Sequence, residues 1–139
     1  MLFPLLKNPP TFSPQHPELK PVFQDVSELD DKLRGQIRCV ICRHTITNKE
    51  SIKSVSGAHI HKFTNPHGIK FTIGCFDSAP GCVPVGGQYS EWSWFLGTTW
   101  QLVLCGSCAE HLGWKYLYDD NSEFFGLNIA QLFYDQSDS

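Results

Sequence analysis

Cys39-Val-Ile-Cys42 and Cys105-Gly-Ser-Cys108 are the two stretches that decide the fold of this 139-residue chain. A C-x-x-C turn presents two thiolates from one backbone knuckle, and two knuckles together fill the four corners of a zinc tetrahedron. A shell closed by four cysteines has no open position for a water or a substrate, so such an ion is structural. The spacing predicts one structural Zn²⁺ per chain, with disulfides or a redox pair as the alternatives. The predicted ligands are Cys39, Cys42, Cys105 and Cys108.

The composition is that of an ordinary globular domain with a slightly low fraction of charged residues. Hydrophobic residues make up 41% and charged residues 18%, and the formal net charge is −3. The eleven Lys and Arg are scattered, which argues against a nucleic-acid footprint. No apolar run approaches the ~20 residues of a membrane-spanning helix. We expect a single-domain monomer that binds neither nucleic acid nor membrane.

The chain divides into three segments by composition. Residues 1–24 are rich in proline and lack periodicity, which predicts an extended arm. Residues 25–134 are expected to form a zinc-binding β domain, and residues 135–139 a polar tail. At the start of the domain, Ser27 as an N-cap, early acids, late bases and Gly35 as a stop predict a short helix over 27–34.

Beyond that helix the pattern is mostly β. Short β-branched or aromatic runs bounded by turn residues predict strands at 36–39, 51–55, 69–75, 100–104 and 113–118. Asn65-Pro-His-Gly68 and Val83-Pro-Val-Gly-Gly87 have the composition of turns. The segment 124–133 is apolar enough to pack back onto the domain.

Four tryptophans lie close together in the sequence, and a single tryptophan is most often a core residue. Trp92 and Trp94 would face the same side if their stretch is extended, with Ser93 on the other side. Trp100 and Trp114 lie on either side of the second knuckle, so a metal there would hold their strands together. An aromatic box of this kind suits a flat ring or a quaternary ammonium. From the residues alone, core packing and a ligand cage are equally open.

Several motifs then occur in a recognisable order. Together with the two knuckles they are Asn65-Pro-His-Gly, Ser93-Trp-Phe-x-Gly, Trp100, His111-Leu-Gly-Trp-Lys-Tyr116 and Phe125-Gly-Leu127. In order and spacing they resemble the CULT domain, the thalidomide-binding domain of cereblon-type proteins, over about residues 36–130. The resemblance implies a free-standing member of that family and a β-tent, in which a four-cysteine zinc site pins two antiparallel sheets at one end.

The resemblance also implies a function, that of a non-catalytic binding module. Its tri-tryptophan cage would bind cyclic imides of the glutarimide or thalidomide type, uracil-like ligands such as pyrimidine nucleosides, or cyclic-imide ends of peptides. The imide N–H would donate to the main-chain carbonyl of Trp92, and the N–H of Trp94 would donate to a ring carbonyl. The implied ligand-binding residues are Asn65, Pro66, Trp92, Ser93, Trp94, Trp100, Trp114 and Tyr116.

Two features depart from the family pattern. Trp92 stands where the family often has histidine or phenylalanine, which affects affinity and ligand choice. Cereblon-type proteins also carry a Lon-like domain and a helical adaptor-binding region, and 139 residues have room for neither. No ubiquitin-ligase adaptor is therefore expected to bind this chain alone.

Cys75 and Cys82 leave a second functional class open. They could form a disulfide, stay as buried thiols, or supply the nucleophile of a β-tent methionine-R-sulfoxide reductase. Neither cysteine lies in the Arg-x-Cys-x-Asn context associated with those enzymes, and Asp77 would disfavour a low pKa of the Cys75 thiol. We therefore expect no enzymatic activity.

Overall fold

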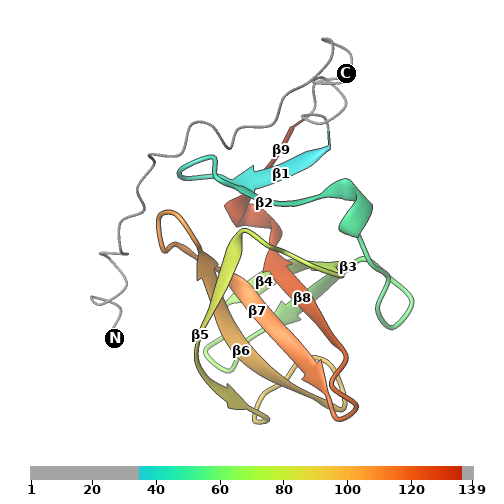
Figure 1. Cartoon of the computed structure of the whole chain (residues 1–139). Coiled ribbons are helices and arrows are strands. Elements are labelled where there is room, and N and C mark those ends of the chain that lie inside the picture. The colour runs from blue at the N-terminus through green and yellow to red at the C-terminus, as the bar shows by residue number, and fades with distance from the viewer. Residues whose placement is uncertain (1–34, 136–139) are drawn as a thin grey trace, which may run out of the picture.

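The computed structural model describes residues 35–135, which consist of strands, turns and two short 3₁₀ helices (Figure 1). No α-helix occurs within 35–135, and no helix there is long and apolar enough to cross a membrane. The expected arm over 1–24, the short helix over 27–34 and nearly all of the polar tail lie outside the described residues. The described part confirms the predicted mostly-β class.

The strands form two antiparallel sheets, as expected for a β-tent. A three-stranded sheet has the order β2-β1-β9, and in Figure 1 it lies above one end of a six-stranded sheet with the order β3-β4-β8-β7-β6-β5. The small sheet contains β1 (Gln36–Cys39), β2 (Thr45–Asn48) and β9 (Leu132–Tyr134). The large sheet contains β3 (Ile60–Thr64), β4 (Lys70–Phe76), β5 (Cys82–Tyr89), β6 (Thr98–Cys105), β7 (His111–Tyr118) and β8 (Glu123–Asn128). The 3₁₀ helices are η3 (Lys49–Ser51) and η4 (Ile129–Gln131).

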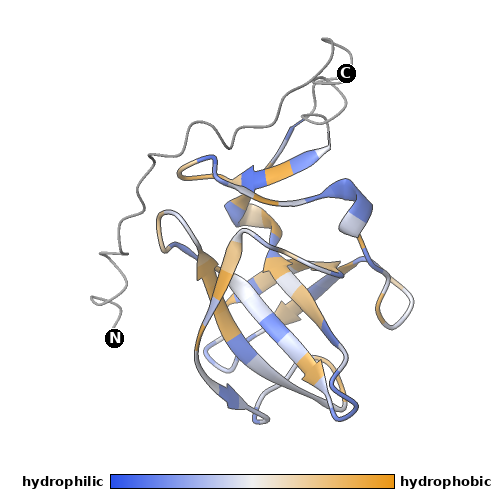
Figure 2. Cartoon of the chain, in the orientation of Figure 1, coloured by the Kyte–Doolittle hydropathy of each residue, from blue (hydrophilic) through white to orange (hydrophobic). Residues whose placement is uncertain are grey.

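The layer between the two sheets is an aliphatic core. Ile37 and Ile46 of the small sheet are fully buried against Val103, Leu112 and Leu127 of the large sheet. Hydrophobic segments of β5 and β6 accordingly lie toward the small sheet in Figure 2. Burial of these side chains is the main force that holds the sheets together.

The large sheet carries a second, aromatic core. Successive side chains of a strand point to opposite faces, so Phe124 joins the aromatic cluster while Phe125 joins the aliphatic one. In the same way, Cys75 joins the aromatic cluster and Phe76 joins the aliphatic one. The aromatic cluster consists of Val55, Cys75, Phe95, Tyr116 and Phe124, with Phe63, Trp94, Trp100, Trp114 and Tyr118 packed against it.

The structure corrects two of the predicted elements. Residues 51–55 are not a strand, because the Asn48 side chain caps η3 by accepting a hydrogen bond from the Ser51 N–H, and only isolated bridges follow, at Ile52 and Val55. Residues 83–87 are not a turn but part of β5. Pro84 is tolerated there because β5 is an edge strand and needs no donor on its outer side.

Candidate functional site

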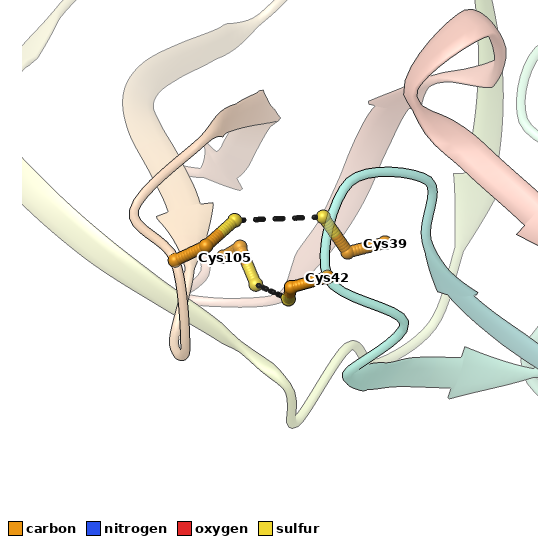
Figure 3. Close-up of side chains that lie close together, drawn as sticks. Cys39, Cys42 and Cys105 are labelled. Atoms are coloured by element: carbon orange, nitrogen blue, oxygen red, sulfur yellow. Dashed lines mark hydrogen bonds between the residues drawn. The ribbon is translucent and has the colours of Figure 1, made fainter.

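The two cysteine knuckles meet between the small sheet and the end of β6. Each knuckle is closed by a main-chain hydrogen bond, from Arg43 N–H to the Cys39 carbonyl (2.8 Å) and from Ala109 N–H to the Cys105 carbonyl (2.9 Å). The four Sγ atoms lie within 4.8 Å of one another. Figure 3 shows Cys39, the last residue of β1, and Cys42, from the turn that follows, facing the second knuckle at the end of β6.

The sulfur positions fit a tetrahedral metal shell. Four sulfurs about 2.3 Å from one zinc ion are about 3.8 Å apart. The observed Sγ–Sγ distances are 3.7 Å for Cys39 and Cys108 and 3.6 Å for Cys42 and Cys105. Burial, together with neighbouring thiols, raises the pKa of Cys105 to about 11 and that of Cys108 to about 12. A bound cation would lower the pKa values of these thiols, because it stabilises their thiolate form. The donor set is therefore that of a closed, structural metal site.

Gly81 connects the second knuckle to the small sheet. Its N–H donates to the Ile46 carbonyl (2.9 Å), and its own carbonyl accepts from the Gly106 N–H (2.8 Å). A Cβ at position 81 would collide with the main-chain carbonyl of Thr45. Glycine at this position therefore lets the two sheets approach closely where the cysteines meet.

A pocket of about 640 Å³ lies on the aromatic face of the large sheet. Seven of the eight predicted ligand-binding residues line it, and Ser93 does not. The seven are Asn65, Pro66, Trp92, Trp94, Trp100, Trp114 and Tyr116.

Ring contacts fix the inner walls of this pocket. Trp94 stacks on Phe63 (ring centroids 4.8 Å apart) and meets Trp114 edge to face (5.1 Å). Phe71 in turn lies edge-on to Trp114 (5.6 Å). Tyr116, only 2% exposed, lies among the buried residues behind these rings. These contacts hold the aromatic walls of the pocket in fixed positions.

Trp100 ties the 91–97 loop to β6. Its indole Nε1–H donates to the Glu91 carbonyl (2.7 Å), and its ring lies 5.0 Å from Tyr89. This hydrogen bond holds the ring at the junction between the loop and the sheet. The indole N–H is thereby satisfied, so Trp100 offers the pocket mainly its apolar faces.

The 91–97 segment is a loop rather than an extended stretch, with φ of 65° at Trp92. Ser93 supports it from the side away from the pocket, since its hydroxyl is 2.7 Å from that of Thr98. The Thr98 hydroxyl donates to the Phe95 carbonyl (2.6 Å) and so closes the loop. Within residues 35–135, the main-chain carbonyl of Trp92 and the N–H of Trp94 have no hydrogen-bond partner.

The Asn65 side chain stabilises the turn in which it lies. Its side-chain oxygen accepts from the N–H groups of His67 and Ile69, both at 2.9 Å. The predicted turn joins β3, a strand that the sequence analysis did not predict, to β4, and it presents Pro66 to the pocket. The role of the Asn65 side chain is therefore to shape the loop.

Sequence reasoning missed several pocket residues. Phe71 and Tyr89 could have been found from pairing, because they lie opposite Phe63 and Trp100 in the register of adjacent strands. The prediction of a turn at 83–87 left out the side of the pocket that β5 forms. The lining residues missed are His67, Phe71, Val85, Gly86, Gly87, Tyr89, Leu102 and His111.

Cys75 and Cys82 belong to different core clusters and form no disulfide. Both are buried, and burial raises the pKa of Cys75 to about 11 and that of Cys82 to about 12. A catalytic thiol needs access to substrate and a low pKa. The structure therefore does not support the reductase alternative.

The fold and the site define a β domain with a four-cysteine metal-type cluster at one end and an aromatic pocket at the other. By sequence it is similar to the protein cereblon: 32% identical to that of Xenopus tropicalis over 114 residues, 34% to that of Gallus gallus over 100, and 32% to that of Danio rerio over 80. These matches cover 76%, 68% and 56% of the chain but only 25%, 22% and 19% of the relatives. No family model matches the chain. The chain thus contains a cereblon-related domain.

Proposed function

We propose that this chain is a CULT-type, non-catalytic binding module that holds a small cyclic imide in its tryptophan pocket. One observation carries the proposal: Trp94, Trp100 and Trp114, which come from a loop and two strands, line one pocket together with the Asn65–Pro66 turn. The similarity to cereblon over most of the chain supports the same assignment.

The chemistry of the pocket agrees with an imide. An imide presents an acceptor, a donor and a second acceptor along one edge, and its ring is flat. The carbonyl of Trp92 and the N–H of Trp94, which have no hydrogen-bond partner within residues 35–135, would complement a donor and one acceptor of this edge. The three indoles would cover the faces of the ring. Uracil carries the same edge, so pyrimidine nucleosides and cyclic-imide peptide ends are further candidate ligands.

The cysteine cluster would hold one structural Zn²⁺ and take no part in ligand chemistry. Its four thiols leave no open coordination position, which supports a purely structural ion. The resident ion would fix the end of β6 against β1, and Trp100 lies on β6. The metal thereby acts on the pocket through the sheet.

The proposal is tested by titrating zinc-loaded protein with glutarimide or uridine and following tryptophan fluorescence. We expect saturable quenching that Trp100→Ala abolishes. Phe133→Ala is the matched control, because Phe133 is an aromatic residue outside the pocket, packed under Arg43. A flat titration of correctly folded wild-type protein with both ligands would overturn the proposed function.

A further inference from the structure

Cys82 is a further cysteine at the metal end of the domain, and the four-cysteine cluster does not include it. It lies directly opposite Cys105 in the pairing of β5 with β6. Both side chains are buried in the aliphatic core, and directly opposite residues of an antiparallel pair point to the same face of the sheet. One cysteine of the cluster therefore has another thiol as its cross-strand neighbour.

The main-chain hydrogen bonds show which type of cross-strand pair these two cysteines form. The N–H groups of Cys82 and Cys105 donate to carbonyls outside the pair. The flanking Gly106 N–H instead donates to the Gly81 carbonyl (2.8 Å). This is the pattern of a non-hydrogen-bonded pair, whose Cα atoms are about 4.5 Å apart. A disulfide spans Cα atoms about 4.4–6.8 Å apart, so it can bridge a pair of this type.

We propose that Cys82 and Cys105 form a reversible disulfide, which competes with metal binding at the cysteine cluster. The Cys105 Sγ atom lies 3.6 Å from that of Cys42, in the position of a metal ligand. Only a thiolate serves as such a ligand, so a Cys105 sulfur bonded to Cys82 leaves the shell one ligand short. This inference goes beyond imide binding and rests on the proposed structural ion. It makes the end that holds the two sheets together sensitive to oxidation.

The oxidant is a small disulfide, such as glutathione disulfide, which reacts by thiol–disulfide exchange. Cys108 is the exposed thiol of the cluster, and the four Sγ atoms lie within 4.8 Å of one another. The Cys108 thiolate attacks the S–S bond of the oxidant, forms a mixed disulfide and releases one glutathione. The Cys105 thiolate displaces the second glutathione, and the Cys82 thiolate then attacks Cys105 and frees Cys108. In balance, the S–S bond of the oxidant breaks, one protein S–S bond forms, and two glutathione molecules carry away the two protons.

Burial of Cys82 does not prevent this reaction, because exchange inside the domain reaches Cys82 without contact between its thiol and the oxidant. Cys75 is the natural comparison. It is also a buried free thiol, but it belongs to the aromatic cluster, and the residue opposite it on β8 is Gly126. The position opposite a cluster cysteine, rather than burial, therefore distinguishes Cys82.

Oxidation of the zinc-loaded full chain with glutathione disulfide tests the pair with two readouts. Zinc release is followed with a weak chromogenic chelator. Disulfides are mapped by mass spectrometry after the free thiols have been alkylated, and proteolysis at Asp77 and Glu91 leaves Cys82 on a fragment without another cysteine. Cys82→Ala removes the pair, and Cys75→Ala is the matched control because it removes a buried thiol of the other cluster.

We expect wild type to form a disulfide between Cys82 and Cys105 and to release its zinc in parallel. At the oxidant concentration that removes half of the zinc from wild type, Cys82→Ala should keep most of its zinc, and Cys75→Ala should behave as wild type. Dithiothreitol with added zinc should restore the metal, because thiol–disulfide exchange is reversible.

A Cys82 thiol that stays free, a disulfide between any other two cysteines, or equally easy zinc release from wild type and Cys82→Ala would overturn the inference. The mapping uses wild-type protein, so it decides the question even if Cys82→Ala does not fold. If reduced wild type carries no zinc, the proposed structural ion fails and the competition with it, whereas the mapping still decides whether the disulfide forms. Imide binding by the reduced protein is measured separately and does not depend on either result.

Discussion

The cysteine end and the aromatic pocket of this domain are built on different principles. At the cysteine end, two short knuckles supply all four sulfurs, and main-chain hydrogen bonds close each knuckle. At the pocket, the lining comes from the turn before β4, the 91–97 loop and strands β4, β5, β6 and β7. The difference teaches that the first site needs two local turns brought together between the sheets, whereas the second needs segments from across the large sheet.

The two ends of the domain are therefore stabilised by different interactions. A metal at the knuckles would stabilise the small sheet against β6, whereas the pocket is stabilised by rings packed on Phe63, Phe71 and Tyr89. Damage to the metal site should therefore remove both fold and pocket. Damage to the pocket should leave the metal site intact.

Removing the metal is expected to have the largest effect. Structural zinc contributes roughly 10–16 kcal/mol in small zinc domains, comparable to or above the total stability of an ordinary domain. A strong chelator, or Cys105→Ser, should abolish the β-sheet circular dichroism and the near-ultraviolet tryptophan signal together. Metal analysis of untreated protein should give one zinc per chain. A stable, metal-free fold with an intact tryptophan signal would show that the cysteine end does not clamp the sheets.

Phe124→Ala should destabilise the aromatic core without emptying the metal site. Phe124 is fully buried between Phe95 and Tyr116. Replacing a buried phenylalanine by alanine costs about 3–5 kcal/mol because it leaves a cavity. Urea unfolding measures the loss, and Phe133→Ala, at an exposed position, should cost much less. A loss below about 1 kcal/mol, or a fall in zinc content of the folded protein, would contradict the separation of the two ends.

Thr98→Val should have a smaller effect, concentrated on the loop that carries Trp94. The Thr98 hydroxyl bonds to the Phe95 carbonyl and to Ser93, and valine leaves both without this partner. Loss of such a hydrogen bond costs about 1–2 kcal/mol, and the looser loop should weaken imide binding several-fold. Calorimetry and urea unfolding provide the two readouts. Unchanged affinity would mean that this hydrogen-bond pair does not position the pocket.

The smallest expected effect is a pH dependence from His111. The residue is exposed overall, but its imidazole packs edge-on to Trp114, and this partial burial lowers the pKa of His111 below its usual 6.5 despite the Gly113 carbonyl and Glu110 nearby. The folded state thus binds its proton less readily than the unfolded state. The stabilising contribution is complete above pH 6.5 and falls as the pH drops through the lowered pKa. His111→Gln should flatten this part of the stability profile, and identical profiles for the two proteins would refute the prediction.

The cysteine cluster and the two-sheet class could be predicted from sequence because C-x-x-C spacing and short β-branched runs are local signals. The inner tryptophans could be assigned to one pocket only through the ordered family motifs. The periodicity of the sequence did not distinguish tryptophans packed in the core from tryptophans that form a ligand cage. The β5 wall could not be predicted, because Pro84 and the glycines after it have turn composition and only the edge position of β5 makes a strand possible. The left-handed backbone of Trp92 lies in a loop that side-chain hydrogen bonds of Trp100 and Thr98 close, and the pattern of residue types does not reveal that geometry.

The central claim is that one end of the domain recognises a ring while the other holds the fold, and amide and indole NMR shifts test it directly. On adding glutarimide to zinc-loaded protein, we expect saturable shifts of the Trp94 main-chain N–H and of the pocket indole N–H groups, with the knuckle amides near Cys39 and Cys105 unchanged. Shifts confined to the knuckles, or none anywhere at saturating ligand, would contradict the account.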